Sequence, residues 1–286
     1  MRVQIVLKPW DSKRLIAKAL LEMDAVQKAL RDGIVMIHPS STTYHMHEFL
    51  TGKKPEGVWL AGMLCPKGAC VEGHTQKAIE DDQYRELSDP ANFPFSWVFR
   101  KGKIEAGGKL SNVLAEMSEG DVYIKGVNAI DAHGYVGVLI GNVVSGGTIG
   151  KVRKAERERK FRVIYAGGLE KFVPGSLMET AKDSGRPNTS DAMGMACGIL
   201  PIQVQAFTEI EALKILAHVE VIPMAAGGVG GAEGSVMFII KGEEANVKMA
   251  MQAAKEAKHS KLPSVIVPVC KTCHWPGCYY SGKDMG

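Results

Sequence analysis

Short apolar runs rich in β-branched residues alternate with segments of helical spacing along much of this chain. The run "IVMI" at 34–37 follows a helical segment at 11–31, and the runs at 121–126 and 162–166 flank a helical segment at 147–160. Strands that are apolar on both faces are typical of a parallel sheet covered by helices on both sides. The alternation therefore predicts an α/β fold with a Rossmann-like parallel sheet.

The last third of the chain has a different order of elements. Strand-like runs at 198–207, 219–228, 234–242 and 263–269 are separated by helical segments at 208–216 and 243–259. The order βαββαβ predicts a small split-βαβ domain of ferredoxin-like type. We divide the chain into an α/β domain at 1–197, a small domain at 198–270 and a cysteine-containing tail at 271–286. The glycine-rich stretch at 225–235 is typical of a hairpin turn, with a phosphate-wrapping loop as the alternative.

Composition excludes several classes of protein. A net charge of +4 over 286 residues is weaker than that of most nucleic-acid binders. No apolar run reaches the roughly 18 residues that cross a membrane, and the first residues lack the pattern of a secretory signal. We therefore expect a cytoplasmic protein with no nucleic-acid or membrane partner, whose six cysteines are thiols or metal ligands.

A hydroxyl-rich turn follows the first predicted strand. Ser40, Ser41, Thr42 and Thr43 lie between "IVMI" and a segment that can be helical. Hydroxyl groups and free backbone N–H groups at the start of a helix favour an anion such as phosphate. An ordinary helix cap with surplus hydroxyls is the alternative interpretation.

A second polar loop follows the strand at 121–126. Ligands of parallel α/β sheets bind beyond the carboxyl ends of the strands, where Lys125, Gly126, Asn128 and Asp131 are expected. Nearby, Gly146, Gly147 and Thr148 open the helix at 147–160, without the spacing of a Walker loop or a dinucleotide fingerprint. The two loops predict one crevice in which Asp131 is the general acid/base, Lys125 attracts negative charge, and the hydroxyls and glycines hold an anion.

These motifs carry a resemblance to a known superfamily. The stretch "DGIVMIHPSSTT" resembles the strand and hydroxyl loop of ribose-phosphate isomerases. The stretch at 121–150 is similar to one shared by sugar-phosphate isomerases, initiation-factor-B-type proteins and CoA transferases, and "RVIYAGGLEKFVP" resembles the following strand in lactate-utilisation proteins. The resemblance covers roughly residues 11–180, and the appended small domain is similar to that of ribose-phosphate isomerase.

The resemblance implies that the chain binds and transforms a phosphorylated or CoA-linked small molecule, by isomerase or acyl-transfer chemistry. CoA is then a candidate cofactor, Glu170 a second candidate carboxylate at the position of the CoA-transferase nucleophile, and a homo-oligomer the expected assembly. The chain departs from the isomerase pattern at His38-Pro39, where glycines are usual, and at 127–129, where an acidic pair is usual. A non-catalytic ligand-binding or assembly protein of the same fold therefore stays open as an alternative.

The segment "CKTCHWPGC" forms a third candidate site. Cys270, Cys273, His274 and Cys278 are spaced closely enough to converge on one soft metal such as zinc, and Cys65 or Cys70 could complete the set. Reduced thiols on a flexible tail and redox-active thiols are the alternatives. A metal or redox protein built on these cysteines is thus a third functional class.

Overall fold

The main sheet of the computed structural model is α/β and mixed. The structure describes residues 1–80, 96–105, 109–258, 260–275 and 278–284. The sheet has the order β10 (Arg162–Ala166), β7 (Val122–Gly126), β2 (Ile34–Ile37), β5 (Trp97–Arg100) and β6 (Lys103–Glu105). Strands β10, β7 and β2 are parallel, whereas β5 and β6 each run antiparallel to the preceding strand in that order. The predicted parallel sheet is confirmed in its first three strands.

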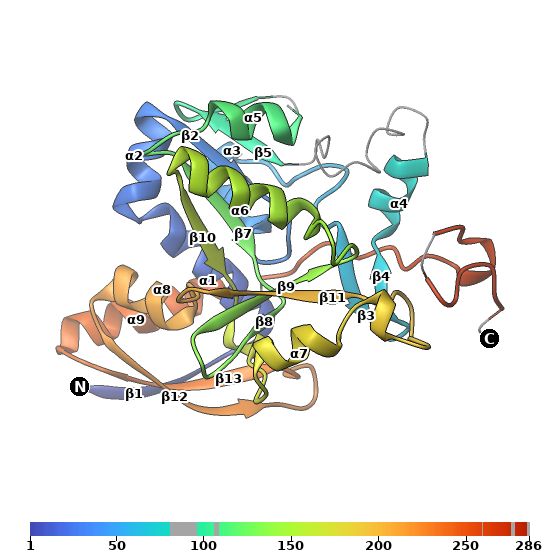
Figure 1. Cartoon of the computed structure of the whole chain (residues 1–286). Helices are drawn as coiled ribbons and strands as arrows, with labels where there is room; N and C mark the ends of the chain where they lie inside the picture. The colour runs from blue at the N-terminus through green and yellow to red at the C-terminus, as the bar shows by residue number, and fades with distance from the viewer. Residues whose placement is uncertain (81–95, 106–108, 259, 276–277, 285–286) are drawn as a thin grey trace.

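Helices cover both faces of this sheet (Figure 1). On one face lie α1 (Pro9–Leu21), α2 (Asp24–Asp32) and α3 (Tyr44–Thr51), and on the other lie α5 (Leu110–Glu116) and α6 (Gly147–Arg159). Alternate residues of β2 point to opposite sides: Val35 and Ile37 pack with α1, whereas Met36 packs with α5 and α6. Strands buried on both faces explain the wholly apolar runs in the sequence.

The predicted single helix at 11–31 is two helices. Helix α1 ends at Leu21, and Met23 is extended before α2 begins. A continuous helix of this length would span about 30 Å, whereas the break lets both helices bury their apolar sides in one core.

A second, antiparallel sheet lies below the main one in Figure 1, with the order β1 (Arg2–Leu7), β13 (Ser235–Lys241) and β12 (Glu220–Gly227). Helices α8 (Glu209–Ala217) and α9 (Glu244–Ala257) pack on it. The additional small unit and the 225–235 hairpin are confirmed.

Two strands of the predicted split-βαβ unit are assigned differently by the structure. Residues 260–269 form no strand, because Pro263 and Pro268 lack N–H donors for a ladder. The N-terminal strand β1 pairs with β13 instead. Strand β11 (Gly198–Gln203) joins a third sheet with β9 (Tyr135–Ile140) and β8 (Ala129–Ile130).

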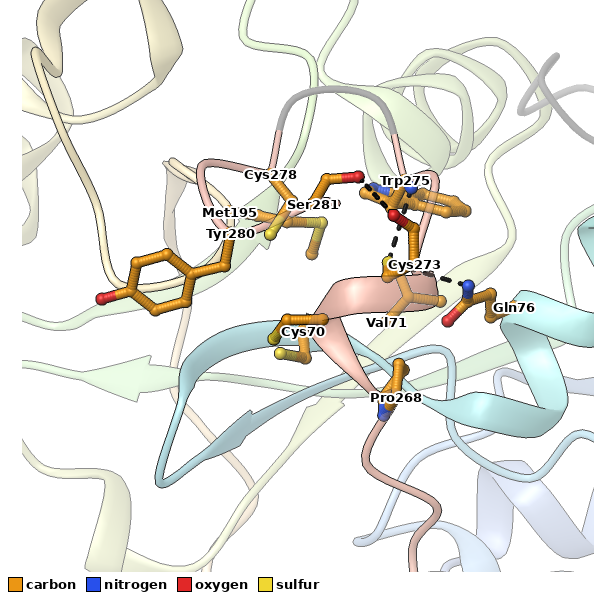
Figure 2. Close-up of a pocket in the computed structure, with 11 residues that line it drawn as sticks. Cys70, Val71, Gln76, Met195, Pro268, Cys273, Trp275, Cys278, Tyr280 and Ser281 are labelled. Carbon is orange, nitrogen blue, oxygen red and sulfur yellow. Dashed lines mark hydrogen bonds between the residues drawn. The ribbon is translucent and has the colours of Figure 1, made fainter. Parts of the chain in front are cut away.

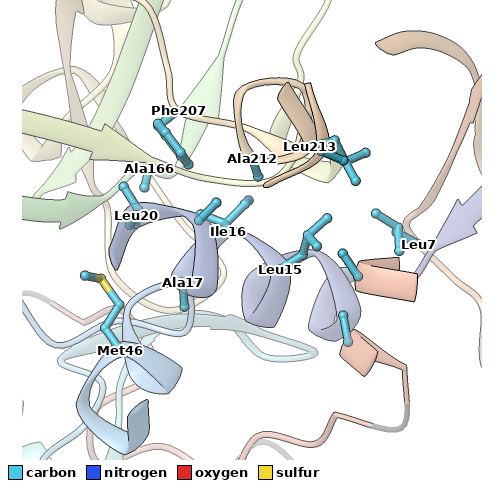
Figure 3. Close-up of a cluster of buried hydrophobic side chains, with 14 of the residues drawn as sticks. Leu7, Leu15, Ile16, Ala17, Leu20, Met46, Ala166, Phe207, Ala212 and Leu213 are labelled. Carbon is cyan, nitrogen blue, oxygen red and sulfur yellow. The ribbon is translucent and has the colours of Figure 1, made fainter. Parts of the chain in front are cut away.

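Helix α1 joins the two main layers. Its buried side chains Leu15, Ile16 and Leu20 lie between α8 and Met46 of α3, as Figure 3 shows. The main and small sheets consequently share one hydrophobic core, and residues at the start of α1 face the carboxyl ends of the parallel strands.

The remaining elements are the hairpin β3 (Gly62–Cys65) and β4 (Gly68–Val71), helices α4 (Gly73–Glu80) and α7 (Leu177–Asp183), and the short 3-10 turns η3 (Leu169–Lys171), η4 (Arg186–Asn188) and η5 (Cys270–Thr272). Among the described residues, none of the helices combines the length and apolar character needed to cross a bilayer.

Candidate functional site

The three parallel strands β2, β7 and β10 end side by side, and polar residues follow each of them. The backbone N–H of His38 donates to Ile124 of β7 at 2.9 Å, and that of Val127 donates to Ala166 of β10 at 3.0 Å. These bonds bring together the hydroxyl loop after β2, Lys125 and Gly126 at the end of β7, and the residues of η3 after β10. This edge is where ligands bind in open parallel sheets.

The hydroxyl loop is held largely by its own side chains. The Thr43 hydroxyl donates to the His38 carbonyl at 2.6 Å, and the Ser40 hydroxyl accepts from the Thr43 N–H at 3.2 Å. Thr42 is fully buried, and its hydroxyl accepts from the Lys171 ammonium at 3.2 Å. Ser41 is half-buried. Of the four hydroxyls, Thr42 is thus the one in contact with a cation.

Gly126 permits the close approach of this loop. A Cβ built on Gly126 would lie 2.5 Å from the Ser40 hydroxyl oxygen, closer than real contacts allow. The absence of a side chain at Gly126 therefore lets the hydroxyl loop pack directly on the end of β7.

The buried Lys125 and the half-buried Lys171 stand beside the loop. Lys171 donates to the Val127 carbonyl at 2.7 Å, and burial lowers its pKa to about 8. Burial and the charge of Lys171 lower the pKa of Lys125 to about 8 as well. Burial, assisted by Lys125, holds the pKa of His38 well below its usual value, so this imidazole is neutral. Both lysines would be stabilised as cations by an added anion.

Two carboxyl groups converge on the opposite side of η3. Glu170 accepts from the Lys13 ammonium at 2.9 Å through Oε1, whereas its buried Oε2 has no hydrogen-bond partner among the described residues. Glu209 accepts from the Leu169 N–H at 2.9 Å and is fully buried. Burial, and next the charge of Glu170, raise the pKa of Glu209 to about 7.

Gly168 separates these two carboxyls. A Cβ at this position would clash with Glu170 Oε2 and would lie 2.8 Å from Glu209 Oε1. Glu170 Oε2 and Glu209 Oε1 therefore both lie next to the backbone at Gly168, where no side chain separates them. Two carboxyls in different surroundings can serve as a base and an acid.

The sequence singled out Lys125, Gly126, Thr42 and Glu170, which the structure brings to this edge with Ser40 and Thr43. It did not single out Lys13, Lys171 and Glu209. Lys13 lies on an amphipathic helix, and Glu209 is the first residue of α8, next to the N-cap Thr208, so both resemble ordinary surface residues in the sequence. Of these three residues, Lys171 could have been found from the sequence, because it directly follows the candidate Glu170 in "GGLEK".

Asp131 makes contacts suited to a structural role. Its carboxylate accepts from the backbone N–H groups of His133, Tyr135 and Leu177 at 2.9 to 3.0 Å. Burial alone would raise the pKa of Asp131, but these three donors together lower it. The carboxylate thus fixes the β8–β9 turn and the start of α7, and its contacts do not favour the predicted role of general acid/base. Asn128 likewise accepts from the Leu139 N–H on β9 at 3.0 Å.

The glycine-rich start of α6 has its contacts within its own loop. The N–H of Gly147 donates to the Ser145 hydroxyl at 3.3 Å, and the N–H of Gly146 donates to the Asn142 carbonyl at 3.1 Å. Gly146 and Gly147 have φ values of 70° and 58°, which explains why glycine stands there. Thr148 follows in the first turn of α6. These contacts do not join this loop to residues 40–43, so the predicted second half of the anion crevice stays a prediction.

Four of the six cysteines lie together, away from the ends of the parallel strands. Cys70 of β4 and the tail residues Cys270, Cys273 and Cys278 line one cavity, and Figure 2 shows three of them around it. Burial, then a hydrogen bond and the charge of Cys65, and then Cys278 and Cys270, raise the pKa of Cys70 to about 12. In the described part of the chain, no three or more His, Cys, Asp or Glu side chains are placed so that they could hold a metal ion without moving. His274 is exposed and does not line the cavity.

Comparison of this chain with protein-family models, with curated proteins and with solved structures gives no match. The residues at the carboxyl ends of the parallel strands and the cysteine-lined cavity are therefore the two candidate sites.

Proposed function

We propose that the chain is an enzyme that binds an anionic small molecule with a carbonyl group at the carboxyl ends of β2, β7 and β10. The substrate class is a sugar phosphate or a CoA thioester. The observation that carries the proposal is the Glu170–Glu209 pair. In it, Glu170 Oε2 is buried with no hydrogen-bond partner among the described residues, and the pKa of Glu209 is raised to about 7.

The pair is suited to moving a proton near neutral pH. A general acid or base works best when its pKa lies close to the working pH, as that of Glu209 does. Glu170 accepts a hydrogen bond from the Lys13 ammonium at 2.9 Å through Oε1, which leaves Oε2 to face a substrate. Glu170 is then the base that takes a proton from the carbon beside the carbonyl, and protonated Glu209 is the group that supplies one.

The lysines supply the charge for the substrate. Lys171 and Lys125 lie next to Thr42 and Gly126, and desolvation lowers the pKa of each. A phosphate or an enediolate oxygen placed beside them would restore their proton affinity and would itself be stabilised. The glycine-rich connection between β12 and β13 lies next to this region, because a Cβ on Gly234 would be 3.8 Å from Glu170 Cβ.

Among the reactions implied by the superfamily resemblance, we favour isomerisation by proton transfer. The carboxylate takes the proton, the electron pair of the broken C–H bond moves into an enediolate, and the neighbouring carbon receives a proton. Acyl transfer would instead use Glu170 as a nucleophile toward a thioester, with the CoA thiolate as the leaving group.

The experiment that tests the proposal has two stages. Thermal shifts are measured with ribose 5-phosphate, other sugar phosphates, CoA and acetyl-CoA, and each stabilising compound is incubated with the protein in D₂O. Isomerisation predicts deuterium at the carbon beside the carbonyl, seen by NMR, whereas acyl transfer predicts an acyl-enzyme that hydroxylamine cleaves. The second outcome would contradict our choice of reaction.

Variants separate chemistry from binding. Glu170→Gln should abolish deuterium incorporation and keep the thermal shift, while Lys171→Met should lose the shift. Glu179→Gln is the control, because Glu179 is exposed on α7 and pairs only with Lys182 in the contacts described. Stabilisation by none of these anions, or full exchange activity in Glu170→Gln, would overturn the proposal.

A further inference from the structure

Two segments far apart in the sequence bring sulfur to one place. Cys70 belongs to the β3–β4 hairpin, and Cys270, Cys273 and Cys278 belong to the tail about 200 residues later. The four side chains line a single cavity, in which Figure 2 labels Cys70, Cys273 and Cys278. Cys65 is the hydrogen-bond neighbour of Cys70. Such a meeting of free thiols is not explained by the strand-end site.

The backbone holds this arrangement at several points. The N–H of Gly282 donates to the Cys270 carbonyl at 2.9 Å, and the Ser281 hydroxyl donates to the Cys273 carbonyl at 2.8 Å. Tyr279 and Ala69 each bond to the segment 193–194, which thus links the tail to the hairpin. The cysteines are therefore placed by tertiary structure and not only by their spacing.

The path of the tail leaves little apolar burial to hold it. Residues 260–269 have no regular structure, and Val265, Ile266 and Val269 are 40%, 51% and 63% exposed. A chain that orders many residues without a core of its own commonly uses a metal or disulfides for stability. The structure joins none of the described cysteines in a disulfide, which leaves a bound metal ion as the way to stabilise the tail.

The lining of the cavity fits one thiolate-preferring ion. Its volume of about 20 Å³ exceeds the roughly 10–15 Å³ that one water-sized sphere needs, so it has room for a single ion. The lining includes no carboxylate or imidazole. Cys273 Sγ also accepts from the Trp275 N–H at 3.5 Å and from the Gln76 amide at 3.7 Å, contacts that stabilise and orient a thiolate ligand.

We propose that Cys70, Cys270, Cys273 and Cys278 bind one Zn²⁺ ion in a structural site that fastens the tail to the β3–β4 hairpin. Four thiolates in tetrahedral geometry are the usual ligand set of structural zinc. Because the ligand group is not already complete, the cysteine side chains rotate toward the cavity on binding. Each thiol releases its proton to solvent as its sulfur coordinates the ion, and no electron is transferred.

The test uses the full chain purified under reducing, oxygen-free conditions. Elemental analysis should find about one zinc per chain, and replacement by Co²⁺ should give the sulfur-to-cobalt charge-transfer band and the strong visible bands of tetrahedral thiolate coordination. Cys70→Ser and Cys273→Ser should each lower the bound metal at least fourfold. Cys197→Ser is the matched control and should keep it, since Cys197 does not line the cavity.

A second measurement does not depend on variants that fold. In the native chain, iodoacetamide should label four more cysteines after zinc is removed with a chelator than before. Absence of the cobalt band in the reduced chain, equal zinc in the wild type and Cys70→Ser, or iron with acid-labile sulfide in place of zinc would each overturn the proposal.

Discussion

Replacing Glu209 with glutamine should change how stability depends on pH. The pKa of Glu209 is 4.5 in ordinary surroundings and about 7 in the folded chain, because the carboxyl is buried and lies near Glu170. Between these values the folded state keeps a proton that the unfolded state releases. The folded state therefore loses stability relative to the unfolded state as the pH rises through 7.

The size of the effect follows from the two pKa values. At about 1.4 kcal/mol for each pH unit, the difference between 4.5 and about 7 corresponds to about 3 kcal/mol. Glutamine has the shape of the protonated carboxyl and retains an acceptor for the Leu169 N–H. The variant removes the titration, so its free energy of unfolding should gain about 3 kcal/mol on the wild type between about pH 4 and pH 8.

Urea denaturation followed by tryptophan fluorescence measures this difference at several pH values. Glu179→Gln, at an exposed position, should run parallel to the wild type throughout. In a Glu170→Gln background the gain should shrink but persist, since burial is the larger cause of the raised pKa. A difference between Glu209→Gln and the wild type that stays constant across this range would refute the reasoning.

Two further substitutions test the assignments of individual residues. Gly168→Ala places a Cβ against both carboxyls and should abolish deuterium incorporation, whereas Gly175→Ala, with open space around it, should keep it; unchanged incorporation in Gly168→Ala would argue against the paired-carboxyl site. Asp131→Asn removes one acceptor for a backbone N–H and should lower the free energy of unfolding by about 1–3 kcal/mol in urea while leaving ligand affinity unchanged. A selective loss of turnover in a stable Asp131→Asn protein would restore Asp131 as a candidate for catalysis, and exposed Asp183→Asn is its control.

The parallel strands could be predicted because their pattern is local. The run at 34–37 is β2 in full, and the predicted strand at 121–126 contains β7. Each is apolar on both faces because helices cover both sides of the sheet. The helix at 147–160 was likewise marked by glycines at its start and charges along its exposed face.

Pairing between distant segments could not be predicted in the same way. Residues 263–269 and the N-terminal residues 2–7 both look like edge strands, and local pattern does not say which one pairs with β13. The choice is made by geometry, since β1 leads directly into α1, whereas the proline-containing segment lacks donors and continues toward the hairpin. The partner of strand β11 could not be predicted from local pattern either, because β9 lies some 60 residues earlier in the sequence.

The residues of the candidate site also differ in whether a local pattern could predict them. Residues at the end of a strand, such as Lys125, or in the loop after one, such as Thr42, were found because the carboxyl ends of parallel strands are a known location for ligands. Lys13 and Glu209 were missed because they come from helices whose role depends on tertiary packing. Glu209 follows a helix cap, Thr208, whose capping box with Glu211 is complete without it.

Helix α1 explains why those residues belong together. Lys13 reaches Glu170, and the Ser12 hydroxyl bonds to Glu209, so two successive residues of one helix contact the two carboxyls. The same helix packs against α8, which carries Glu209, through Leu15 and Ile16. The small sheet and its helices therefore act on the strand-end site by fixing the position of α1. Core substitutions under α8 should for that reason disturb the proton affinity of Glu209 as well as the stability of the small sheet.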